Sequence, residues 1–507
     1  MSRLRRLAQN VSSGYLQVAA NSVYTLLSIP LALHYLSKKE FALWMLVAQI
    51  AGWLMLVDAG MTNASIRFLI DHKDRPDDGI YGSVFRTGSV VLAIQGAMIA
   101  ALSSVVGFMT GLFAVPAEYI QAFRLLLLGH GVVTGFSFCM RMYGCVLSAH
   151  QRHDIVNYIS TVGFAVNLAV LWAGFHVGLG IYSLLAAYSA STLIAAIAYV
   201  IAAYRLNILP PAGARGHLDR NIFKELFRFA NDLLLMSIGV QLVNASQIVI
   251  ITRTLGLEAA AVWSVAMKGY GLAQQFIWKL WDFSANAISE MIVRHESERL
   301  RRRLKELVML TASASVVAGI AAGACNESLL ALWTRHRISW SGLNDLLLPL
   351  VFVVTSVTRV HAGFIGATKR IRGLRYVYFL EGGAFVAAGF VLAPRFGFPA
   401  VLIGAAVMNV LFTGAYGICR TAEEFRISRI EVLSWVLPAV QVAAVFGPIS
   451  LGCWWLSLTW ADMPRLATNM IVAATVGPVL LWKLGITPGL QSEIRAKVQS
   501  GLRRFER

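Results

Sequence analysis

Long apolar runs, each about 20 residues, recur from one end of this 507-residue chain to the other. At 1.5 Å per residue, such a run crosses the ~30 Å hydrocarbon core of a bilayer. Because lipid cannot satisfy exposed backbone N–H and C=O groups, each run is expected to form an α-helix. Composition agrees, since 57% of the residues are apolar and only 14% are charged, against about 25% charged in a soluble domain. The chain is therefore predicted to be an all-α integral membrane protein.

The apolar runs predict fourteen spans, with both termini on one side of the membrane. They are placed at 11–33, 41–62, 84–113, 119–148, 155–175, 181–203, 229–251, 259–281, 307–333, 344–366, 376–393, 399–419, 431–457 and 466–484.

The distribution of lysine and arginine tests this count. Taking alternate connections as cytoplasmic places 32 of the 44 basic residues on that side. The opposite side receives seven, namely Lys38, Lys39, Arg253, Arg335, Arg337, Arg395 and Arg465. Because cytoplasmic connections are enriched in lysine and arginine, the alternation supports the span count and predicts cytoplasmic N- and C-termini. The net charge of +18 lies in short patches between apolar runs, which argues against a nucleic-acid partner.

A short internal repeat divides the chain. Segment 36–44 follows span one and segment 255–263 follows span seven, with leucine, alanine and tryptophan at matching positions; chance similarity is the alternative. Because six spans is an even number, the repeat predicts two six-helix lobes related by a pseudo-two-fold axis along the membrane normal, plus two extra C-terminal helices. The predicted parts are an N-lobe at 1–203, a cytoplasmic linker at 204–228, a C-lobe at 229–420, the two extra helices at 421–484, and a basic amphipathic helix on the lipid surface at 485–507.

The segment from Leu36 to Trp44, followed by Asp58-Ala59-Gly60 at the end of span two, resembles polysaccharide exporters of the multidrug/oligosaccharidyl-lipid/polysaccharide (MOP) superfamily. In that family a Leu-Gly…Tyr-Gly pattern follows the first helix, and Asp-x-Gly closes the second. Ser37, Phe41 and Ala42 depart from the first pattern, whereas the second is kept. The resemblance covers spans one to twelve in layout. It implies two six-helix lobes around a central cavity and alternating access, and it does not define the cargo.

Of the 44 basic residues, 39 are assigned to connections and five are left within the helices. A charge at mid-membrane costs about 2.5–3.5 kcal/mol and usually faces a cavity or a partner. Lys268, Arg141 and Arg359 lie deepest and are predicted to line a substrate-binding cavity; structural pairing with carboxylates or carbonyls is the alternative. Lys268 is the first choice, because its span lines the cavity in the family that the chain resembles. Arg124 and Lys279 lie near span ends, where they are expected to reach toward the interface, and they remain secondary candidates.

Two groups of amide or acidic side chains also lie within the spans or at their ends. The acidic group, near predicted cytoplasmic span ends, comprises Asp58, Asp232, Asp282 and Glu381, for which pairing with nearby cations is the simpler explanation. The amide group includes Gln49, Gln241 and Gln274, which either contact sugar hydroxyls or bond between helices. Asp58 and Gln274 are retained as secondary candidates for the site.

These cations suit an anionic cargo, because guanidinium groups bind phosphate through paired donors. We therefore predict a flippase of a bacterial inner membrane that moves a polyprenyl-pyrophosphate-linked oligosaccharide to the outer leaflet for O-antigen or exopolysaccharide biosynthesis. Expected partners are this substrate, membrane lipids, and a polysaccharide polymerase or glycosyltransferases. The alternatives are a cation-coupled multidrug or metabolite exporter and a lipid II flippase. Span one contains no acidic residue, which disfavours the cation-coupled exporter.

A membrane enzyme, such as a polysaccharide polymerase or ligase, is the alternative of another class. The longest predicted external connection, about 334–343, is too short for a catalytic site. The sequence contains no G-x-x-x-x-G-K-[ST] motif, no H-E-x-x-H motif and no CxxC pair among its five cysteines. Neither enzymatic activity nor a metal or other cofactor is predicted.

Overall fold

The computed structural model describes residues 3–73, 79–368, 372–492 and 495 of the chain. Every regular element among them is helical, which confirms the all-α prediction. The chain forms two compact units, residues 1–264 and 265–507, and their boundary lies within helix α10 (Leu257–Val293). The lobe and linker boundaries that the sequence suggests stay predictions.

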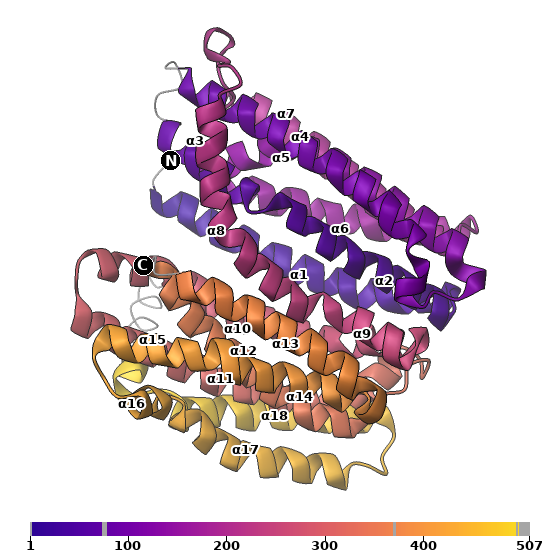
Figure 1. Ribbon diagram of the computed structural model, residues 1–507. Coiled ribbons are helices and arrows are strands. Elements are labelled where there is room, and N and C mark those ends of the chain that lie inside the picture. Colours follow the sequence, from indigo (N-terminus) through magenta and orange to yellow (C-terminus); the bar gives the residue numbers. More distant parts are fainter. Residues whose placement is uncertain (1–2, 74–78, 369–371, 493–494, 496–507) are drawn as a thin grey trace, which may run out of the picture. The chain divides into compact units, whose positions relative to one another are not determined.

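The first unit is a bundle of long helices, coloured indigo to magenta in Figure 1. Before α10 its α-helices are α1 (Arg3–Tyr35), α2 (Lys38–Leu54), α3 (Met61–His72), α4 (Ile80–Phe108), α5 (Ile120–Ala149), α6 (His153–His176), α7 (Tyr182–Arg205), α8 (Arg220–Asn244) and α9 (Ser246–Leu255). Its short 3-10 turns are η1 (Met55–Asp58), η3 (Thr110–Phe113), η4 (Ala117–Tyr119) and η5 (Ala212–Ala214).

Small residues allow helices α4 and α5 to pack closely. A Cβ atom built on Gly96 would lie 2.3 Å from the carbonyl oxygen of Gly135, and one on Gly135 would lie 2.5 Å from the carbonyl oxygen of Gly96. Neither position can carry a side chain without moving a backbone. Close approach through small residues is a common means of helix association in membranes, where lipid removes most of the hydrophobic driving force between helices.

The Asp58-Ala59-Gly60 motif forms the turn between α2 and α3. Ala59 and Gly60 both have left-handed backbone angles, with φ of 47° and 80°. The Asp58 carboxylate accepts hydrogen bonds from the backbone N–H of Thr62 at 3.2 Å and from its hydroxyl at 2.5 Å. The glycine therefore supplies the conformation that the turn requires, and the aspartate satisfies donors at the start of α3.

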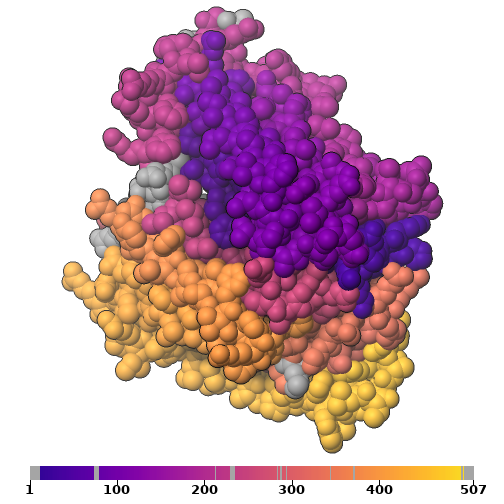
Figure 2. All heavy atoms as spheres, turned by 45° about the vertical axis from the view of Figure 1, so that its right-hand side comes forward, coloured from indigo at the N-terminus to yellow at the C-terminus, as the bar shows by residue number. Residues whose placement is uncertain are grey.

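The second unit holds the remainder of α10 and the last helices of the chain. They are α11 (Ser297–Trp333), α12 (Gly342–Ala367), α13 (Arg372–Phe396), α14 (Phe398–Asn409), the π-helical turn η6 (Val410–Gly414), α15 (Ala415–Phe425), α16 (Arg429–Ser434), α17 (Leu437–Leu456) and α18 (Asp462–Leu484). Helix α11 packs against α12, α17 and α18. The last helices form a continuous orange-to-yellow surface in Figure 2.

A buried carboxylate accompanies the π-helical turn. Glu381 of α13 is only 3% exposed, and its carboxylate accepts from the Asn409 amide at 2.9 Å and from the backbone N–H of Thr413 at 3.1 Å. The hydroxyl of Thr413 contacts the same carboxylate. A backbone N–H inside a span is thus bonded to a side chain, which is how a regular helical ladder becomes interrupted.

Thirteen helices in the described part of the chain are long and apolar enough to cross a bilayer. They correspond to all the predicted spans except 259–281, which lies in α10. With 37 residues, α10 is easily long enough, but Lys268, Gln274, Gln275 and Lys279 interrupt its apolar sequence. Helix α10 is therefore too polar to be counted among these apolar spans, and it is the helix that contains Lys268, the first-choice site residue.

The two copies of the short repeat have similar local structures. In the first, α1 ends at Tyr35, and a capping box between Ser37 and Glu40 starts α2. In the second, α9 ends at Leu255, Gly256 has φ of 95°, and α10 starts one residue later. The matching alanines (Ala42 and Ala261) and tryptophans (Trp44 and Trp263) are all buried.

Candidate functional site

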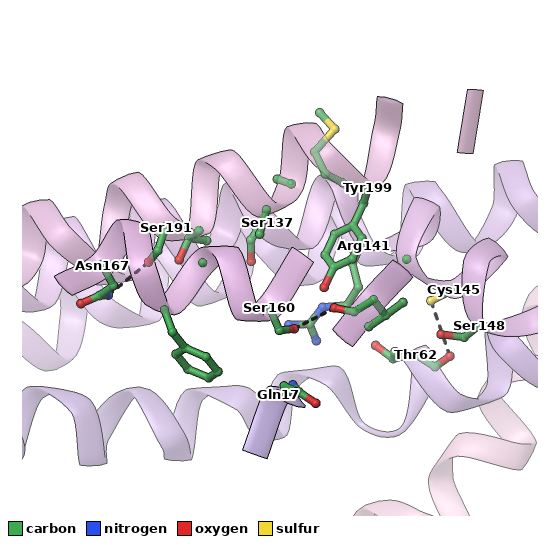
Figure 3. Close-up of a pocket in the computed structure, with 18 of the residues that line it drawn as sticks. Gln17, Thr62, Ser137, Arg141, Cys145, Ser148, Ser160, Asn167, Ser191 and Tyr199 are labelled. Atoms are coloured by element: carbon green, nitrogen blue, oxygen red, sulfur yellow. Dashed lines mark hydrogen bonds between the residues drawn. The ribbon is translucent and has the colours of Figure 1, made fainter. Parts of the chain in front are cut away.

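A cavity of about 570 Å³ lies within the helix bundle of the first unit, lined by residues of α1, α3, α5, α6 and α7. Figure 3 shows polar side chains from several of these helices around it. Gln17, Ser137, Ser160 and Asn167 contribute amides and hydroxyls, and Arg141 contributes a guanidinium group. Polar side chains on the wall of a cavity inside a transmembrane bundle are expected to face water or a ligand rather than lipid.

Tyrosines give the cavity an amphipathic lining. Tyr24, Tyr188 and Tyr199 all contribute to the wall. The Tyr24 hydroxyl donates to the Asn167 side-chain oxygen at 2.9 Å, and the Asn167 amide donates to the Ser191 hydroxyl at 3.2 Å. These bonds connect α1, α6 and α7 and fix the polar atoms in place. Aromatic faces beside fixed amides and hydroxyls are suited to a ligand that presents both C–H surface and hydroxyl groups, as a sugar does.

Arg141 is the cation of this cavity. Its guanidinium carbon lies 3.6 Å from the centre of the Phe138 ring, and its Nη1 lies 3.9 Å from the Asp58 carboxylate. The side chain keeps 29% of its surface exposed. At 3.9 Å the ion pair is long, and within the described residues the guanidinium makes no hydrogen bond, so its donors remain available to a ligand.

Asp58 connects this cation to the fold. Its carboxylate contacts Thr62 and Arg141. The backbone carbonyl of Asp58 also accepts a hydrogen bond from the Gln95 amide of α4 at 3.1 Å. The expectation that Asp58 pairs with a nearby cation is therefore met by an arginine 83 positions away in sequence. Asp58 borders the site and positions Arg141 rather than lining the cavity itself.

Lys268 lies on a polar face of α10 in the second unit. Lys268, Gln275, Lys279 and Asp282 are spaced at i, i+7, i+11 and i+14, which places them on one side of a helix. Lys268, Gln275 and Asp282 are exposed, and Lys268 has no hydrogen-bond or ion-pair partner among the described residues. Placing an exposed ammonium group of a membrane helix in water costs far less free energy than placing it in lipid, so Lys268 is expected to face water.

Arg359 and Lys279 share one carboxylate. Arg359 Nη2 donates to Asp282 Oδ1 at 3.2 Å, and Lys279 Nζ lies 3.5 Å from Asp282 Oδ2. The Arg359 guanidinium also lies 4.4 Å from the ring centre of Trp278. Both cations are thus paired, as the structural alternative anticipated, but two positive charges face a single negative one. The Arg359 side chain is 39% exposed and the Lys279 side chain is 43% exposed.

The amides and the remaining candidates have structural partners. Gln274 donates to the Thr355 hydroxyl at 3.0 Å. Gln49 and Gln241 donate to backbone carbonyls of Asn244 and Gly52, at 3.1 Å each, and so bond between α2 and α8. These contacts favour interhelical bonding over sugar recognition. Arg124 lies 4.9 Å from the centre of the Phe108 ring.

Two acidic residues complete this comparison with the sequence. Glu381 does not pair with a cation among the described residues; its partners are Asn409 and Thr413, so the expected ion pair is wrong there. Asp232 lies outside the residues whose side chains are described.

Sequence reasoning missed most of the cavity lining in the first unit. The missed residues include Gln17, Tyr24, Ser160, Asn167, Tyr188 and Tyr199. A signal was present, because Gln17 and Tyr24 lie seven residues apart, as do Ser160 and Asn167. Polar residues at that spacing mark one face of a helix. The amides that the sequence singled out, Gln49, Gln241 and Gln274, do not line this cavity.

Comparison with solved structures defines the class of protein. The fold is similar to that of an inward-facing multidrug resistance MATE family transporter of the MOP superfamily, with a TM-score of 0.66 at 14% identity over 80% of this chain and 96% of that one. It is also similar to a MOP superfamily transporter from Pyrococcus furiosus, with a TM-score of 0.60 at 13% identity over 83% of this chain and 96% of that one. A third similar structure is the lipid II flippase MurJ in an inward closed conformation, with a TM-score of 0.62 at 8% identity over 94% of this chain and 98% of that one. The protein therefore has the fold of the MOP transporter superfamily.

The sequence defines the family. The sequence model described as "Polysaccharide biosynthesis protein" matches residues 7–280, more than half of the chain, and the protein belongs to this family. No curated protein matches the chain. The family and the fold together confirm the resemblance that the sequence suggested, and the protein is a multi-pass membrane protein.

Proposed function

We propose that this protein is a flippase that moves a polyprenyl-pyrophosphate-linked oligosaccharide from the inner to the outer leaflet of a bacterial inner membrane, by alternating access. Membership of the polysaccharide biosynthesis family supports a saccharide-containing cargo. The observation that carries the proposal is the cavity of the first unit, where hydroxyls, amides and tyrosine rings surround one guanidinium group.

The cavity divides into two chemical regions that match the two parts of such a head group. Arg141 has donors available for a phosphate, which planar guanidinium groups bind bidentately. Asn167 and Ser191 lie on α6 and α7, beside Tyr188, and offer hydrogen bonds and a ring face to a sugar. In the second unit Lys268 supplies a further cation on an exposed polar face, with no ion-pair partner in the part of the chain that the structure describes.

The proposed cargo explains why cations inside the spans are tolerated. A head group with several negative charges cannot enter hydrocarbon, so it requires a hydrated path with fixed positive charges. An exporter of organic cations would instead gain from carboxylates on such a path. The charged residue that lines the first-unit cavity is the cation Arg141, and the polar face of α10 carries Lys268 and Lys279 against one carboxylate, Asp282.

Reconstitution into vesicles tests the proposal. Wild type is supplied with a fluorescent polyprenyl-pyrophosphate oligosaccharide, and its arrival in the opposite leaflet is measured by a membrane-impermeant quencher. We expect Arg141→Ala, Lys268→Ala and Arg359→Ala to reduce the rate. Arg67→Ala is the matched control, because Arg67 is an exposed cation that pairs with Asp71 on α3 at 3.5 Å and does not line the cavity.

Three outcomes would overturn parts of the proposal. Normal rates in all three variants would refute the site. Transport of a small organic cation without transport of the labelled lipid would establish the exporter alternative. Transport of lipid II in preference to other lipid-linked oligosaccharides would assign the protein to peptidoglycan precursors instead. Polysaccharide polymerase and glycosyltransferases are the proposed partners, and cytoplasmic termini are the proposed orientation.

A further inference from the structure

A second charged cavity lies far along the sequence from the proposed transport site, at the start of α11. Its volume is about 540 Å³, and its lining combines Arg299, Arg301, Arg302 and Lys305 of α11 with Glu298, Glu431 and Trp435. Four cations and two carboxylates leave this lining with a net positive charge. The volume lies within the 300–1,000 Å³ typical of sites for small organic ligands.

The length of α11 places this cavity at the level of the lipid head groups. A helix of 37 residues is about 55 Å long, whereas the hydrocarbon core is about 30 Å thick. The uninterrupted apolar sequence of α11 begins at Leu307, after the charged stretch 298–306. The cavity therefore lies on the part of α11 that extends beyond the hydrocarbon.

The cations of the cavity differ in how they are engaged. Arg299 bonds to Glu296 at 2.9 Å, and Arg301 bonds to Glu298 at 3.1 Å. Arg302 and Lys305 are exposed and have no ion-pair or hydrogen-bond partner among the described residues. Glu298 bonds to Arg301 and not to Arg302, although Arg302 lies at the i, i+4 spacing that favours ion pairs on a helix. Two cations three positions apart are left with free donors on one helix face.

The floor of the cavity is rigid. Trp435 is only 1% exposed and belongs to a buried cluster with Leu300, Leu304 and Val432. Its indole N–H is buried and has no hydrogen-bond partner among the described residues. Buried donors without partners are uncommon and require an explanation, and a ligand is one. The part of α11 that carries Arg302 and Lys305 is therefore held on a packed base, although the two side chains themselves are exposed.

The geometry points to a binding site for a phosphate-bearing lipid head group in this cavity. A phosphodiester has the charge to satisfy Arg302 and Lys305 and oxygen atoms to accept from them. The surrounding bilayer presents such groups at the level where the cavity lies. Glu298 and Glu431 set a limit on affinity and favour a ligand that also carries hydroxyl groups for the carboxylates, as a phosphoglycerol head group does. This inference is independent of the proposed cargo.

Lipid titration of the purified full-length protein tests the site. The protein in neutral detergent is titrated with phosphatidylglycerol, or with phosphatidylcholine of the same acyl chains, and the melting temperature is recorded. We expect phosphatidylglycerol alone to raise the melting temperature of the wild type. In Arg302→Gln/Lys305→Gln, which changes two exposed side chains, we expect the titration midpoint to rise about tenfold or more.

The matched control is Arg294→Gln/Arg420→Gln, which removes the same charge from two cations outside the cavity that pair with Glu290 and Glu423. This variant should retain the wild-type midpoint. Inorganic pyrophosphate should compete with the lipid; stabilisation by pyrophosphate but not by phosphatidylglycerol would support the phosphate chemistry and assign it to a soluble source. Equal effects of the two lipids, or equal midpoints in the two double variants, would overturn the inference.

Discussion

The proposed phosphate-bearing cargo would compete with Asp58 for the guanidinium group of Arg141. The proposal therefore predicts opposite changes in affinity when Asp58 and Arg141 are substituted. In Asp58→Asn the amide oxygen can still accept from Thr62, so the turn into α3 should be retained. The negative charge beside Arg141 is lost. We therefore expect Asp58→Asn to bind a pyrophosphate head group more tightly, and Arg141→Gln to bind it more weakly.

The geometry sets the magnitude. Two unit charges 3.9 Å apart attract by about 4 kcal/mol at an effective dielectric constant of about 20. Solvent reaches both side chains, with 29% and 19% exposure, and desolvation opposes the attraction, so the net effect is smaller. A net change of about 1.4 kcal/mol corresponds to a tenfold change in affinity. We expect about tenfold tighter binding in Asp58→Asn and at least tenfold weaker binding in Arg141→Gln.

Fluorescence anisotropy of a labelled polyprenyl pyrophosphate in detergent measures these affinities at one fixed ionic strength. Arg67→Gln serves as the control, because it breaks an exposed ion pair with Asp71 on the same short helix as Thr62. Its affinity should equal that of the wild type. If Asp58→Asn and Arg141→Gln both weaken binding while both proteins melt at the wild-type temperature, the competition between carboxylate and cargo does not exist.

Three further predictions concern stability, measured as melting temperature in detergent. Gly96→Val should lower it by several degrees, since a Cβ atom there meets a backbone oxygen at 2.3 Å, whereas Gly163→Ala, with nothing within 4 Å, should be neutral. Arg465→Met should cost about 3 kcal/mol of stability, because it leaves the Glu327 carboxylate, which Arg465 contacts at 2.8 Å, without its cation. Arg465→Met/Glu327→Leu should recover most of the loss, and no recovery would contradict a stabilising ion pair between these residues. Ser37→Ala should cost about 1 kcal/mol through loss of the capping box of α2, and an unchanged melting temperature would show that this cap is not limiting.

The fold was predictable because lipid imposes one rule on every apolar run. That rule does not depend on packing, so the lengths of the apolar runs and the alternating distribution of lysine and arginine between them sufficed for the span layout. The Asp58-Ala59-Gly60 turn was also recognisable, since left-handed backbone angles favour particular residues.

The site was only partly predictable, because its contacts join residues far apart in sequence. Arg141 was identifiable as a cation inside a span, but its pairing with Asp58 depends on how α5 packs beside the α2–α3 turn. Asn167 and Ser191 were passed over, because an uncharged polar residue in a span is explained equally well by bonding between helices. Only their shared position around one cavity distinguishes these roles.

The π-helical turn at 410–414 also sets the rotation of the chain on either side of it. Each residue of an α-helix advances the direction of the side chain by about 100°, so one additional residue in a turn rotates everything beyond it by that angle. Side chains of α14 and α15 that a regular helical wheel would place together therefore point in different directions. Removing a single residue here would swing Ala415–Phe425 by more than a quarter turn and return the N–H of Thr413 to the helix, away from Glu381.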